Sequence, residues 1–339
     1  MNAKQQTAEI LENSGTEYVS GSVIAERLGI TRAAVWKCIK QMEAEGYEIE
    51  STKKGYRLGE KSDALSRSLI LKYLGVEASY YNIEVFDVID STNTYLKKKA
   101  PEYLSDITEG RALQKDGKKP EWYAVIADRQ DLGRGRMGRS FVSPAGSGIY
   151  LSILFKPQLS AQQAVSMTTA AAVAACRAIE ECTDSKPQIK WVNDIFIDGK
   201  KTCGILTEAS VDLEGGGLDW AVIGIGFNVY MPEGGFPEEI KDIAGSIVKE
   251  RSRDLRSRIA ALFLKELHAI CRDLKASDFA KEYKNRCFLI GKNINVIKDG
   301  EMIPAVAYDL DDELHLLVRY EDGTTEALNS GEVSVREKK

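Results

Sequence analysis

The residues with the clearest chemical character lie in Gln130–Phe141, where Arg134, Arg136 and Arg139 alternate with glycines. Glycine lets backbone N–H groups approach an anion closely, and arginine supplies a permanent planar charge. The stretch therefore predicts a loop that binds a phosphate-bearing or carboxylate-bearing ligand. It matches neither the P-loop, which ends in Gly-Lys-Ser/Thr, nor the GxGxxG dinucleotide turn. Arg-Gly-Arg tripeptides also occur in disordered RNA-binding tails, but the flanking residues here read as strands, which favours a folded loop.

A second candidate group is Lys190-Trp191-Val192-Asn193-Asp194, between two short predicted strands. A lysine in an apolar strand loses hydration energy unless it meets an anion. That anion could belong to a ligand, or it could be a neighbouring carboxylate such as Asp194. The residues alone leave both interpretations open.

Two further segments combine small and polar residues at strand ends. Asp90-Ser91-Thr92-Asn93 precedes a lysine-rich helix, and helix capping is its simplest explanation. Gly224-Ile225-Gly226-Phe227-Asn228 places glycines in a strand, which lets another group pass close to the backbone, and ends in a polar amide.

The elements that must position these residues are short strands around one strong helix. The helix is expected over Ala161–Glu181, and its apolar residues predict burial against a sheet. Strands and helices interleave without a regular βαβ rhythm, which predicts an α+β sandwich. The predicted strands are Val85–Ile89, Trp122–Ala127, Ile149–Phe155, Ile189–Val192, Ile195–Ile197, Thr202–Val211 and Leu218–Phe227, the last two joined by a turn at Glu214–Gly217.

The N-terminal residues 5–60 predict three helices and a β-hairpin. Ser20 is a good N-cap for the second helix, Gly29 ends it, and Thr31 caps the third. Tyr47–Leu58 alternates around a Lys-Lys-Gly turn, as a wing would. A helix, a glycine turn and a second helix at this spacing are typical of a winged helix-turn-helix.

The charges of this unit favour DNA over protein as its partner. Basic side chains on the third helix and wing would lie where phosphate oxygens pass a groove-inserted helix. Small winged domains also mediate protein contacts, and scattered lysines are often only a solvated face. The DNA-contact candidates are Thr31, Arg32, Trp36, Lys37, Lys40, Lys53 and Lys54, with Arg57 as a further wing cation.

The C-terminal part predicts two helices and then a small barrel. These two helices are expected at Arg253–Leu274 and Ser277–Asn285, and a short connecting helix is expected at Asp63–Leu74, after the N-terminal unit. We also expect about five antiparallel strands in an SH3-like barrel, including Lys292–Lys298, Met302–Asp309, Glu313–Tyr320 and Thr324–Leu328. The expected domains are residues 1–63, 64–286 and 287–339.

Composition excludes several classes of protein and site. The net charge of −5 means that nucleic-acid contact must come from a local basic cluster. Two histidines and six cysteines without a CxxC pair argue against a histidine-rich metal site or a His-based triad, so no metal site is predicted. No signal peptide or membrane-length apolar run is present, so a cytoplasmic location is expected.

In this order, between a winged helix and a small barrel, the four segments resemble the biotin protein ligases, and specifically the bifunctional type that also represses biotin genes. The resemblance runs from about Thr7 to Val335, and the glycine–arginine loop is its most specific element. It implies that biotin and ATP form biotinyl-5′-AMP, that Mg²⁺ assists, and that a lysine of a biotin carboxyl carrier protein of acetyl-CoA or pyruvate carboxylase then takes the biotin. It also implies a ligand-promoted homodimer that binds a palindromic operator, with biotinyl-5′-AMP as corepressor.

The resemblance also assigns roles to individual residues. Ser91, Thr92, Asn93 and Gln130 would hold the ureido head of biotin. Arg134, Gly135 and Arg136 would enclose the carboxylate and phosphate, with Arg139 supporting the loop. Lys190 would lie at the carboxylate–phosphate junction and Asn228 near the nucleotide, so that Lys190 and Arg136 are the expected catalytic pair.

The chain departs from the family pattern at two positions and carries one long polar stretch. The family usually has tryptophan at Phe141 and proline at Val192, but neither change removes a charge. Asp106–Glu121 is expected to be a surface loop. Arg134–Ser140 and Met231–Pro237 are expected to be mobile without ligand, because a loop that closes over a mixed anhydride protects it from water.

Other functions are compatible with parts of this pattern. A lipoate–protein ligase shares the catalytic architecture, but lipoate has no ureido ring for the polar residues to bind. A ligand-responsive transcription factor without ligase activity would not need Arg136 and Lys190. A third alternative is an adaptor that binds proteins through the C-terminal barrel.

Overall fold

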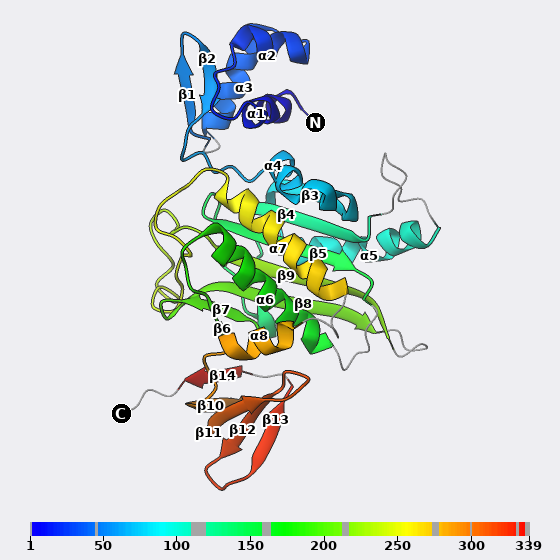
Figure 1. Ribbon diagram of the computed structural model, residues 1–339, viewed down its shortest axis with the longest axis vertical. Coiled ribbons are helices and arrows are strands. Elements are labelled where there is room, and N and C mark those ends of the chain that lie inside the picture. The colour runs from blue at the N-terminus through cyan, green and yellow to red at the C-terminus, as the bar shows by residue number, and fades with distance from the viewer. Residues whose placement is uncertain are drawn as a thin grey trace.

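The chain forms three units in series, as the computed structural model in Figure 1 shows. A small helical unit lies at one end, a large sheet-containing unit in the centre and a β unit at the other end. The predicted α+β class with these three architectures is confirmed. The structure describes residues 2–44, 47–109, 120–157, 164–211, 217–272, 278–298, 300–329 and 332–335. In these ranges no helix is both long and apolar enough to cross a membrane.

The N-terminal unit is a winged helix-turn-helix. The Ser20 side chain accepts the Val23 N–H at the start of its second helix, and Gly29 ends that helix at φ 63°. Thr31 Oγ1 accepts the Ala34 N–H at 3.1 Å, which caps the third helix as predicted. The elements are α1 Ala3–Asn13, α2 Gly21–Leu28, α3 Arg32–Ala44, β1 Ile49–Thr52 and β2 Gly55–Leu58. A core that includes Leu11, Ile24, Val35 and Met42 holds them together.

The central unit is built on a seven-stranded mixed sheet in the order β3-β4-β5-β9-β8-β7-β6. Only β3 and β4 pair in parallel, since a helix connects them and the other neighbours are antiparallel. The strands are β3 Tyr81–Ile89, β4 Trp122–Gln130, β5 Gly148–Phe155, β6 Gln188–Lys190, β7 Asp194–Ile197, β8 Lys200–Val211 and β9 Leu218–Asn228.

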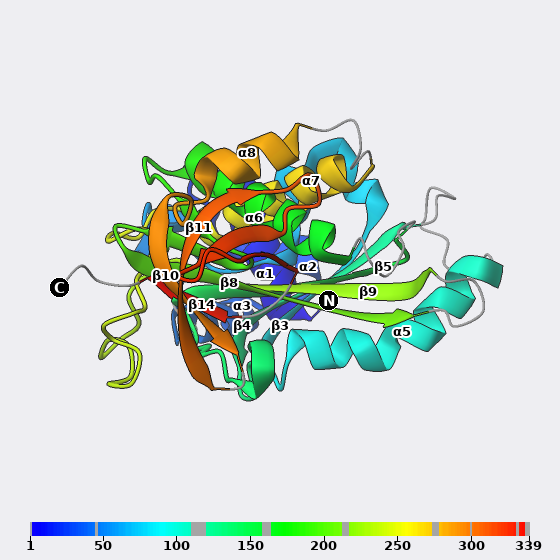
Figure 2. The same ribbon diagram turned by 90° about the horizontal axis from the view of Figure 1, so that it is seen from below.

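Helices cover both faces of this sheet, as Figure 2 shows for α5 on one side and α6 and α7 on the other. Along β4, Trp122 and Ile126 face the α6–α7 side, whereas Tyr123 and Val125 pack with α5. Burial of both faces explains why β4 reads as a continuous apolar run without alternation. The helices are α4 Arg67–Leu74, η1 Gly75–Tyr80, α5 Thr92–Glu109, α6 Ala164–Cys182, α7 Leu255–Arg272 and α8 Phe279–Arg286.

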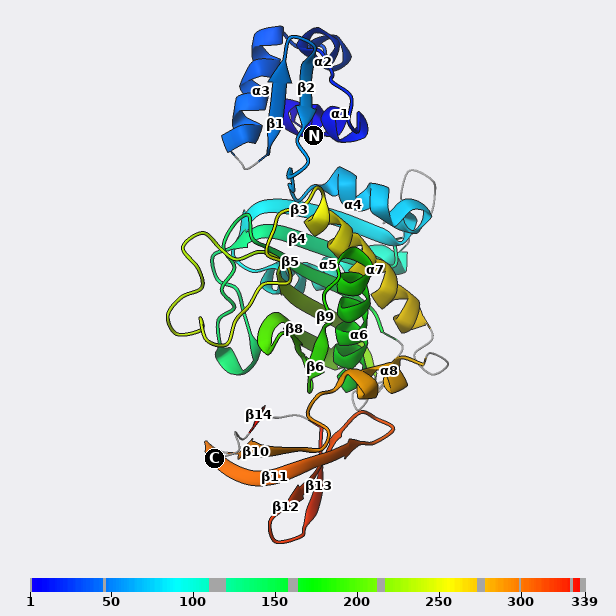
Figure 3. The ribbon, with the colours of Figure 1, turned by 60° about the vertical axis from the view of Figure 1, so that its left-hand side comes forward.

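The C-terminal unit is a five-stranded antiparallel sheet in the order β13-β12-β11-β10-β14, seen most openly in Figure 3. It is attached to the central unit through the Trp191 indole, whose Nε1 donates to Leu314 O at 3.0 Å. The strands are β10 Lys292–Lys298, β11 Glu301–Leu310, β12 Leu316–Tyr320, β13 Thr325–Leu328 and β14 Glu332–Val335.

Some predicted boundaries were wrong. The connecting helix starts at Arg67 rather than Asp63, because Ser66 is its N-cap and residues 59–65 form a linker. The strand expected over Ile189–Val192 stops at Lys190, where the chain turns. Residues 106–109 of the expected surface loop belong to α5. The rest of that loop up to 119, the turn residues 214–216 and helix residues 161–163 lie outside the described residues.

Candidate active site

A cavity of about 290 Å³ opens in the central unit, beside the ends of several strands. All eight residues expected to bind the small substrate line it: Ser91, Thr92, Asn93, Gln130, Arg134, Gly135, Arg136 and Lys190. These residues come from three segments that are far apart in the sequence, so the tertiary fold has brought them together. The sequence did not single out Lys201 and Ile243, which also line the cavity.

The glycine–arginine loop folds back on itself as a tight hairpin. Phe141 N donates to Gly133 O at 2.9 Å, and Gly135 N donates to Arg139 O at 2.7 Å. Gly133 is required here, because a Cβ atom on it would lie 2.3 Å from the Phe141 carbonyl oxygen. Backbone bonds at both ends thus give the loop a defined shape, unlike that of a disordered basic tail.

Two arginines connect this loop to other strands. Arg136 Nη1 donates to Asn193 Oδ1 at 2.7 Å, which joins the loop to the turn after β6. Arg134 Nη1 lies 3.8 Å from Glu208 Oε1 on β8. The contacts of Arg134 and Arg136 therefore help to hold the loop over the cavity.

Lys190 lies at the end of β6, half-buried, with its Nζ 6.0 Å from the centre of the Phe196 ring. Asp194, the carboxylate considered as its neighbour, pairs with Lys201 at 2.7 Å. Among the described lining residues, five cationic side chains (Arg134, Arg136, Arg139, Lys190 and Lys201) therefore accompany one carboxylate. This excess of positive charge suits an anionic ligand.

A hydrogen-bonded network of uncharged side chains forms the polar floor of the cavity. The Thr92 N–H donates to Gln130 Oε1 at 2.9 Å, and Gln130 Nε2 donates to Ser143 Oγ at 3.0 Å. Ser152 Oγ, fully buried on β5, donates to Asn93 Oδ1 at 2.6 Å and lies 2.6 Å from Thr92 Oγ1. Each amide is held in one orientation before any ligand arrives.

Glu208, a charged residue that the sequence did not reveal, supports this network from outside the cavity lining. It accepts hydrogen bonds from Asn93 Nδ2 at 3.0 Å and Lys97 Nζ at 2.7 Å. Burial alone would raise its pKa, but Lys97, Asn93 and the charge of Arg134 outweigh burial and the pKa is lowered. Glu208 therefore stays ionised and connects the start of α5 to the arginine loop. A charged residue in the otherwise apolar and small stretch Cys203–Ser210 was the only sequence signal.

The glycines of β9 leave room for two side chains of the protein itself. A Cβ atom on Gly224 would lie 1.9 Å from Asn93 Oδ1, and one on Gly226 would lie 2.3 Å from the Phe141 ring. The prediction that something passes close to this strand is confirmed, and the groups are Asn93 and Phe141. Phe141, at the position where the family usually has tryptophan, also packs edge-on against the Tyr150 ring, with the two ring centres 6.3 Å apart.

Asn228 and Val192 are both buried beside the site. Asn228, expected near the nucleotide, lies at the end of β9 and is not among the residues that line the cavity. Val192 is buried, follows a cis Trp191–Val192 peptide bond, and accepts a hydrogen bond from Tyr283 Oη at 3.1 Å.

The predicted DNA-contact residues of α3 and of the wing are all exposed. Arg32, Trp36 and Lys37 are exposed on α3, and Trp36 keeps 56% of its accessible surface. Lys40 is exposed as well but pairs with Glu43 at 2.5 Å. Lys53 and Lys54 lie at the exposed turn of the wing. Arg57 differs from this expectation, because Glu50 pairs with it at 2.8 Å and it covers the Tyr18 ring.

Within the described part of the chain, no three His, Cys, Asp or Glu side chains gather as metal ligands. The cavity itself offers the Asp194 carboxylate, which Lys201 already neutralises. A divalent ion would therefore depend mainly on oxygen atoms of a bound phosphate ligand, which is the usual arrangement for Mg²⁺.

Three regions of the sequence match known families. Residues 85–228 match the Biotin/lipoate A/B protein ligase family, residues 4–57 match an HTH domain, and residues 289–336 match the Biotin protein ligase C terminal domain.

Individual relatives and solved structures match large parts of the chain. The bifunctional ligase/repressor BirA of Bacillus spizizenii is 34% identical over 325 residues, which cover 94% of this chain and 95% of the relative. The Bacillus subtilis protein of the same name is 38% identical over 245 residues, covering 72% of this chain and 70% of the relative. Among solved structures, the biotin protein ligase from Aquifex aeolicus in complex with biotin and ATP has a TM-score of 0.58 and 26% identity, covering 76% of this chain and 99% of that one.

Proposed function

The chain belongs to the biotin protein ligase family, in its bifunctional ligase/repressor form, and we propose that the cavity described above is where it joins biotin to ATP. The protein forms biotinyl-5′-AMP and transfers the biotinyl group to a lysine of a biotin carboxyl carrier protein. It also represses biotin biosynthesis and transport genes, with biotinyl-5′-AMP as corepressor. Since ATP and operator DNA are its partners, we infer a cytoplasmic location.

One observation supports this proposal above all: two fixed arginines and a lysine face one cavity whose floor is polar and uncharged. The reaction must bring a carboxylate against the α-phosphate of ATP, and both are anions. Arg134, Arg136 and Lys190 offset this repulsion and the charge that develops on the phosphate during attack. Backbone bonds within the loop and the contact with Asn193 set the direction of Arg136, and closing of the loop on ligand binding would complete the site.

The polar floor would receive the ureido head of biotin, through Ser91, Thr92, Asn93 and Gln130. Ser91 Oγ accepts the Thr94 N–H at 3.4 Å, which leaves its hydroxyl proton to donate to the ureido oxygen. The amides of Asn93 and Gln130 are already oriented by Ser152, Glu208 and Ser143. We assign to Asn93 and Gln130 the recognition of the ring edge, and this polar requirement favours biotin over lipoate.

The chemistry consists of two steps, the first at the α-phosphorus of ATP and the second at the acyl carbon of biotin. First a carboxylate oxygen of biotin attacks the α-phosphorus of ATP, the bond to the bridging oxygen breaks, and pyrophosphate leaves. Next the neutral ε-amine of the acceptor lysine attacks the acyl carbon, AMP leaves and the amine loses a proton. ATP would enter as its magnesium complex, and the ion would further neutralise the phosphates. Arg136 and Lys190 are the residues to which we assign charge stabilisation at the junction.

A homodimer is proposed for the repressor state. The strand β7 pairs with β8 only as far as Gly204, so the later part of β8 has β9 on one side and no described strand on the other. Such an edge can pair with the same edge of a second copy. A two-fold dimer would then present two winged units to a palindromic operator. The proposed DNA contacts are Thr31, Arg32, Trp36, Lys37, Lys40, Lys53 and Lys54.

The proposal is tested by incubating the protein with radiolabelled biotin, Mg·ATP and a biotin carboxyl carrier domain. We expect label on the carrier, and a loss of about 100-fold or more in kcat/KM for Lys190→Ala and Arg136→Ala. Undiminished transfer in both variants would show that the residue roles are wrong. No transfer by the unaltered protein, despite biotin binding, would leave a repressor without ligase activity, and transfer of lipoate instead would identify a lipoate ligase.

A further inference from the structure

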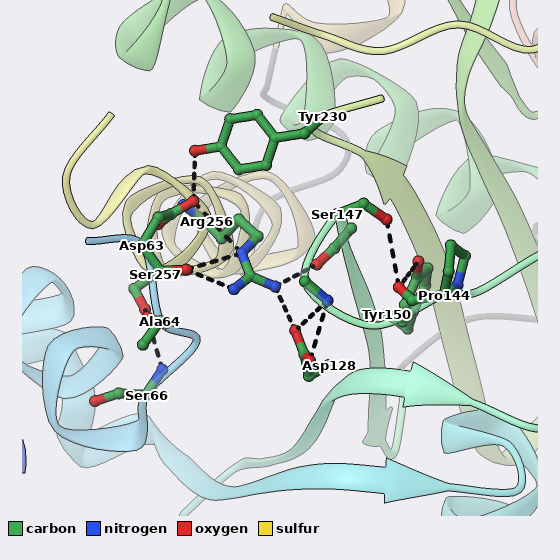
Figure 4. Close-up of polar contacts among 12 residues, drawn as sticks. Asp63, Ala64, Ser66, Asp128, Pro144, Ser147, Tyr150, Tyr230, Arg256 and Ser257 are labelled. Atoms are coloured by element: carbon green, nitrogen blue, oxygen red, sulfur yellow. Dashed lines mark hydrogen bonds and ion pairs between the residues drawn. The ribbon is translucent and has the colours of Figure 1, made fainter. Parts of the chain in front are cut away.

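A buried arginine outside the cavity joins segments that the sequence keeps far apart, as Figure 4 shows. Arg256, at the start of α7, is 4% exposed. Its Nη1 pairs with Asp128 on β4 and donates to Gly148 O at 3.3 Å. Its Nη2 donates to Asp63 O at 2.5 Å. Burial would lower the pKa of Arg256, but the charges of Asp128 and Asp63 outweigh it and the pKa is raised.

Asp63, in the linker between the winged unit and the central unit, holds both ends of the segment 230–256. Its Oδ2 accepts the Tyr230 hydroxyl at 2.5 Å at one end. Its Oδ1 accepts the Arg256 N–H at 2.9 Å at the other end, where the backbone donors of α7 begin. The Asp63 side chain has no exposed surface. A linker residue thus closes a long segment of the catalytic unit.

Both partners of Asp63 lead to the cavity. The segment that Asp63 closes carries Ile243, which lines the cavity and accepts the Lys201 N–H through its carbonyl at 2.8 Å. On the other side, Asp128 accepts the Gly146 N–H at 3.1 Å and so holds the turn that follows Ser143. Asp128 is also two residues before Gln130 on β4. The linker is therefore joined through Tyr230 to the segment that carries Ile243, and through Arg256 and Asp128 to the strand that carries Gln130.

The winged unit is attached next to the same place. Glu12 of α1 accepts the Ser66 and Ser68 hydroxyls at the start of α4, the former at 3.1 Å. Arg253, three residues before Arg256, donates to Gly15 O at the end of the same helix at 2.9 Å. The orientation of α1 is consequently set by residues immediately beside Asp63 and Arg256.

We propose that Asp63, with Tyr230 and Arg256, is the joint through which occupancy of the biotinyl-5′-AMP site sets the position of the DNA-binding unit. Any shift of the Ile243 segment or of the 144–148 turn on ligand binding is taken up at Asp63, because Asp63 or its partner Arg256 contacts both. Since coupling is reciprocal, restraint of the linker also alters the affinity for the ligand. Tyr230, Asp63 and Arg256 are positioning residues, and this inference rests on the proposed function.

The test uses the full chain with biotin and Mg·ATP, and measures hydrogen exchange by mass spectrometry together with transfer to a carrier domain. In the unaltered protein, ligand slows exchange both in residues 130–141 and in the linker 59–66, each by about fivefold or more. Tyr230→Phe removes one hydroxyl and keeps the ring beneath Arg251. In this variant we expect the ligand to protect 130–141 as before, while linker protection falls to less than about half and kcat for transfer stays within about twofold.

Tyr103→Phe is the matched control, because its hydroxyl bonds to Pro120 O far from the joint. It should behave as the unaltered protein does. Asp63→Asn removes the charge and should abolish linker protection. If Asp63→Asn does not fold, the result for Tyr230→Phe alone decides between the outcomes. The inference is overturned if the ligand still protects the linker in Tyr230→Phe. It is also overturned if the ligand protects residues 130–141 of the unaltered protein but not its linker. Absence of protection at 130–141 would instead overturn the proposed function.

Discussion

Arg136 Nη1 and Asn193 Oδ1 lie 2.7 Å apart, although 57 residues separate them in the chain. Asn193 also donates from Nδ2 to Ile205 O at 3.0 Å, so its amide cannot rotate without losing a bond. The arginine at the centre of the ligand loop therefore has its direction set by the turn that follows Lys190. This contact joins the glycine–arginine loop and the Lys190–Asp194 segment into one site.

Replacing Asn193 tests that relationship. In Asn193→Ala the guanidinium of Arg136 loses its partner, and we expect kcat/KM for biotinyl-5′-AMP formation to fall about 10- to 100-fold, since small displacements of a catalytic group are costly. Pyrophosphate release without a carrier domain measures this step. An unchanged rate would mean that Asn193 does not position Arg136.

Glu208→Gln should raise KM for biotin about tenfold with little change in kcat. The variant loses charge-assisted bonds to Asn93 and Lys97, which are typically worth about 1.5–3 kcal/mol each. Steady-state kinetics with varied biotin separate the two parameters. Glu102→Gln, which removes a comparable pair with Lys99 on the exposed face of α5, is the control. Equal effects in both variants would contradict a specific role for Glu208.

Gly224→Ala should abolish tight biotin binding. The added methyl would lie 1.9 Å from Asn93 Oδ1, which a fully engaged amide cannot accommodate by a small shift. Isothermal titration with biotin measures the loss, expected to exceed about 100-fold because the amide must leave its site. Gly21→Ala, whose methyl meets the Tyr56 ring at an ordinary 3.4 Å, should bind biotin normally. Normal binding by Gly224→Ala would show that Asn93 is not needed.

The stability of the junction with the winged unit should depend on pH through Glu12. Burial raises the pKa of its carboxyl above the usual 4.5, although Ser68 and Ser66 donate to it. The folded protein then keeps a proton that the unfolded chain has lost. Its stabilising contribution is therefore complete below about pH 4.5 and disappears as pH rises through the folded pKa.

Melting temperatures of the unaltered protein and Glu12→Gln should accordingly be compared from about pH 4.5 to 7.5. As pH rises, the melting temperature of Glu12→Gln should increase relative to that of the unaltered protein, because glutamine has no proton to lose at this position. The exposed residue Glu17, replaced by glutamine, serves as the control. A difference that does not vary with pH would count against a raised Glu12 pKa.

The two wing lysines should contribute salt-dependent affinity for duplex DNA. Lys53→Ala combined with Lys54→Ala is expected to weaken binding to any sequence and to lower the slope of log K against log salt by about 2, because each lysine neutralises one phosphate. Fluorescence anisotropy with a duplex of arbitrary sequence is sufficient. Arg57→Ala should change the slope little, because Glu50 already neutralises that arginine. A slope unaffected by the double replacement would place the DNA elsewhere.

Much of the local structure could be predicted from the residues because short-range chemistry determines it. Ser20, Gly29 and Thr31 mark helix ends by hydrogen bonds and backbone angles that involve only their neighbours. Gln130–Phe141 showed its ligand chemistry because glycine freedom and arginine charge are properties of those residue types. The boundary errors, such as the early start assigned to α4, arose where a polar linker merged into a helix without a change of pattern.

Residue types and local patterns were enough to identify the groups that could neutralise an anion, and most of the helices and strands that carry them. Which of these groups meet depends on the packing of distant segments. It placed Glu208 beside Asn93 and Arg134, left Asn228 outside the cavity lining, and put the linker carboxylate of Asp63 against Arg256. The reason is physical: contacts between distant segments depend on strand order and register, which no local preference encodes, and a buried charge takes its role from the partners that burial brings to it.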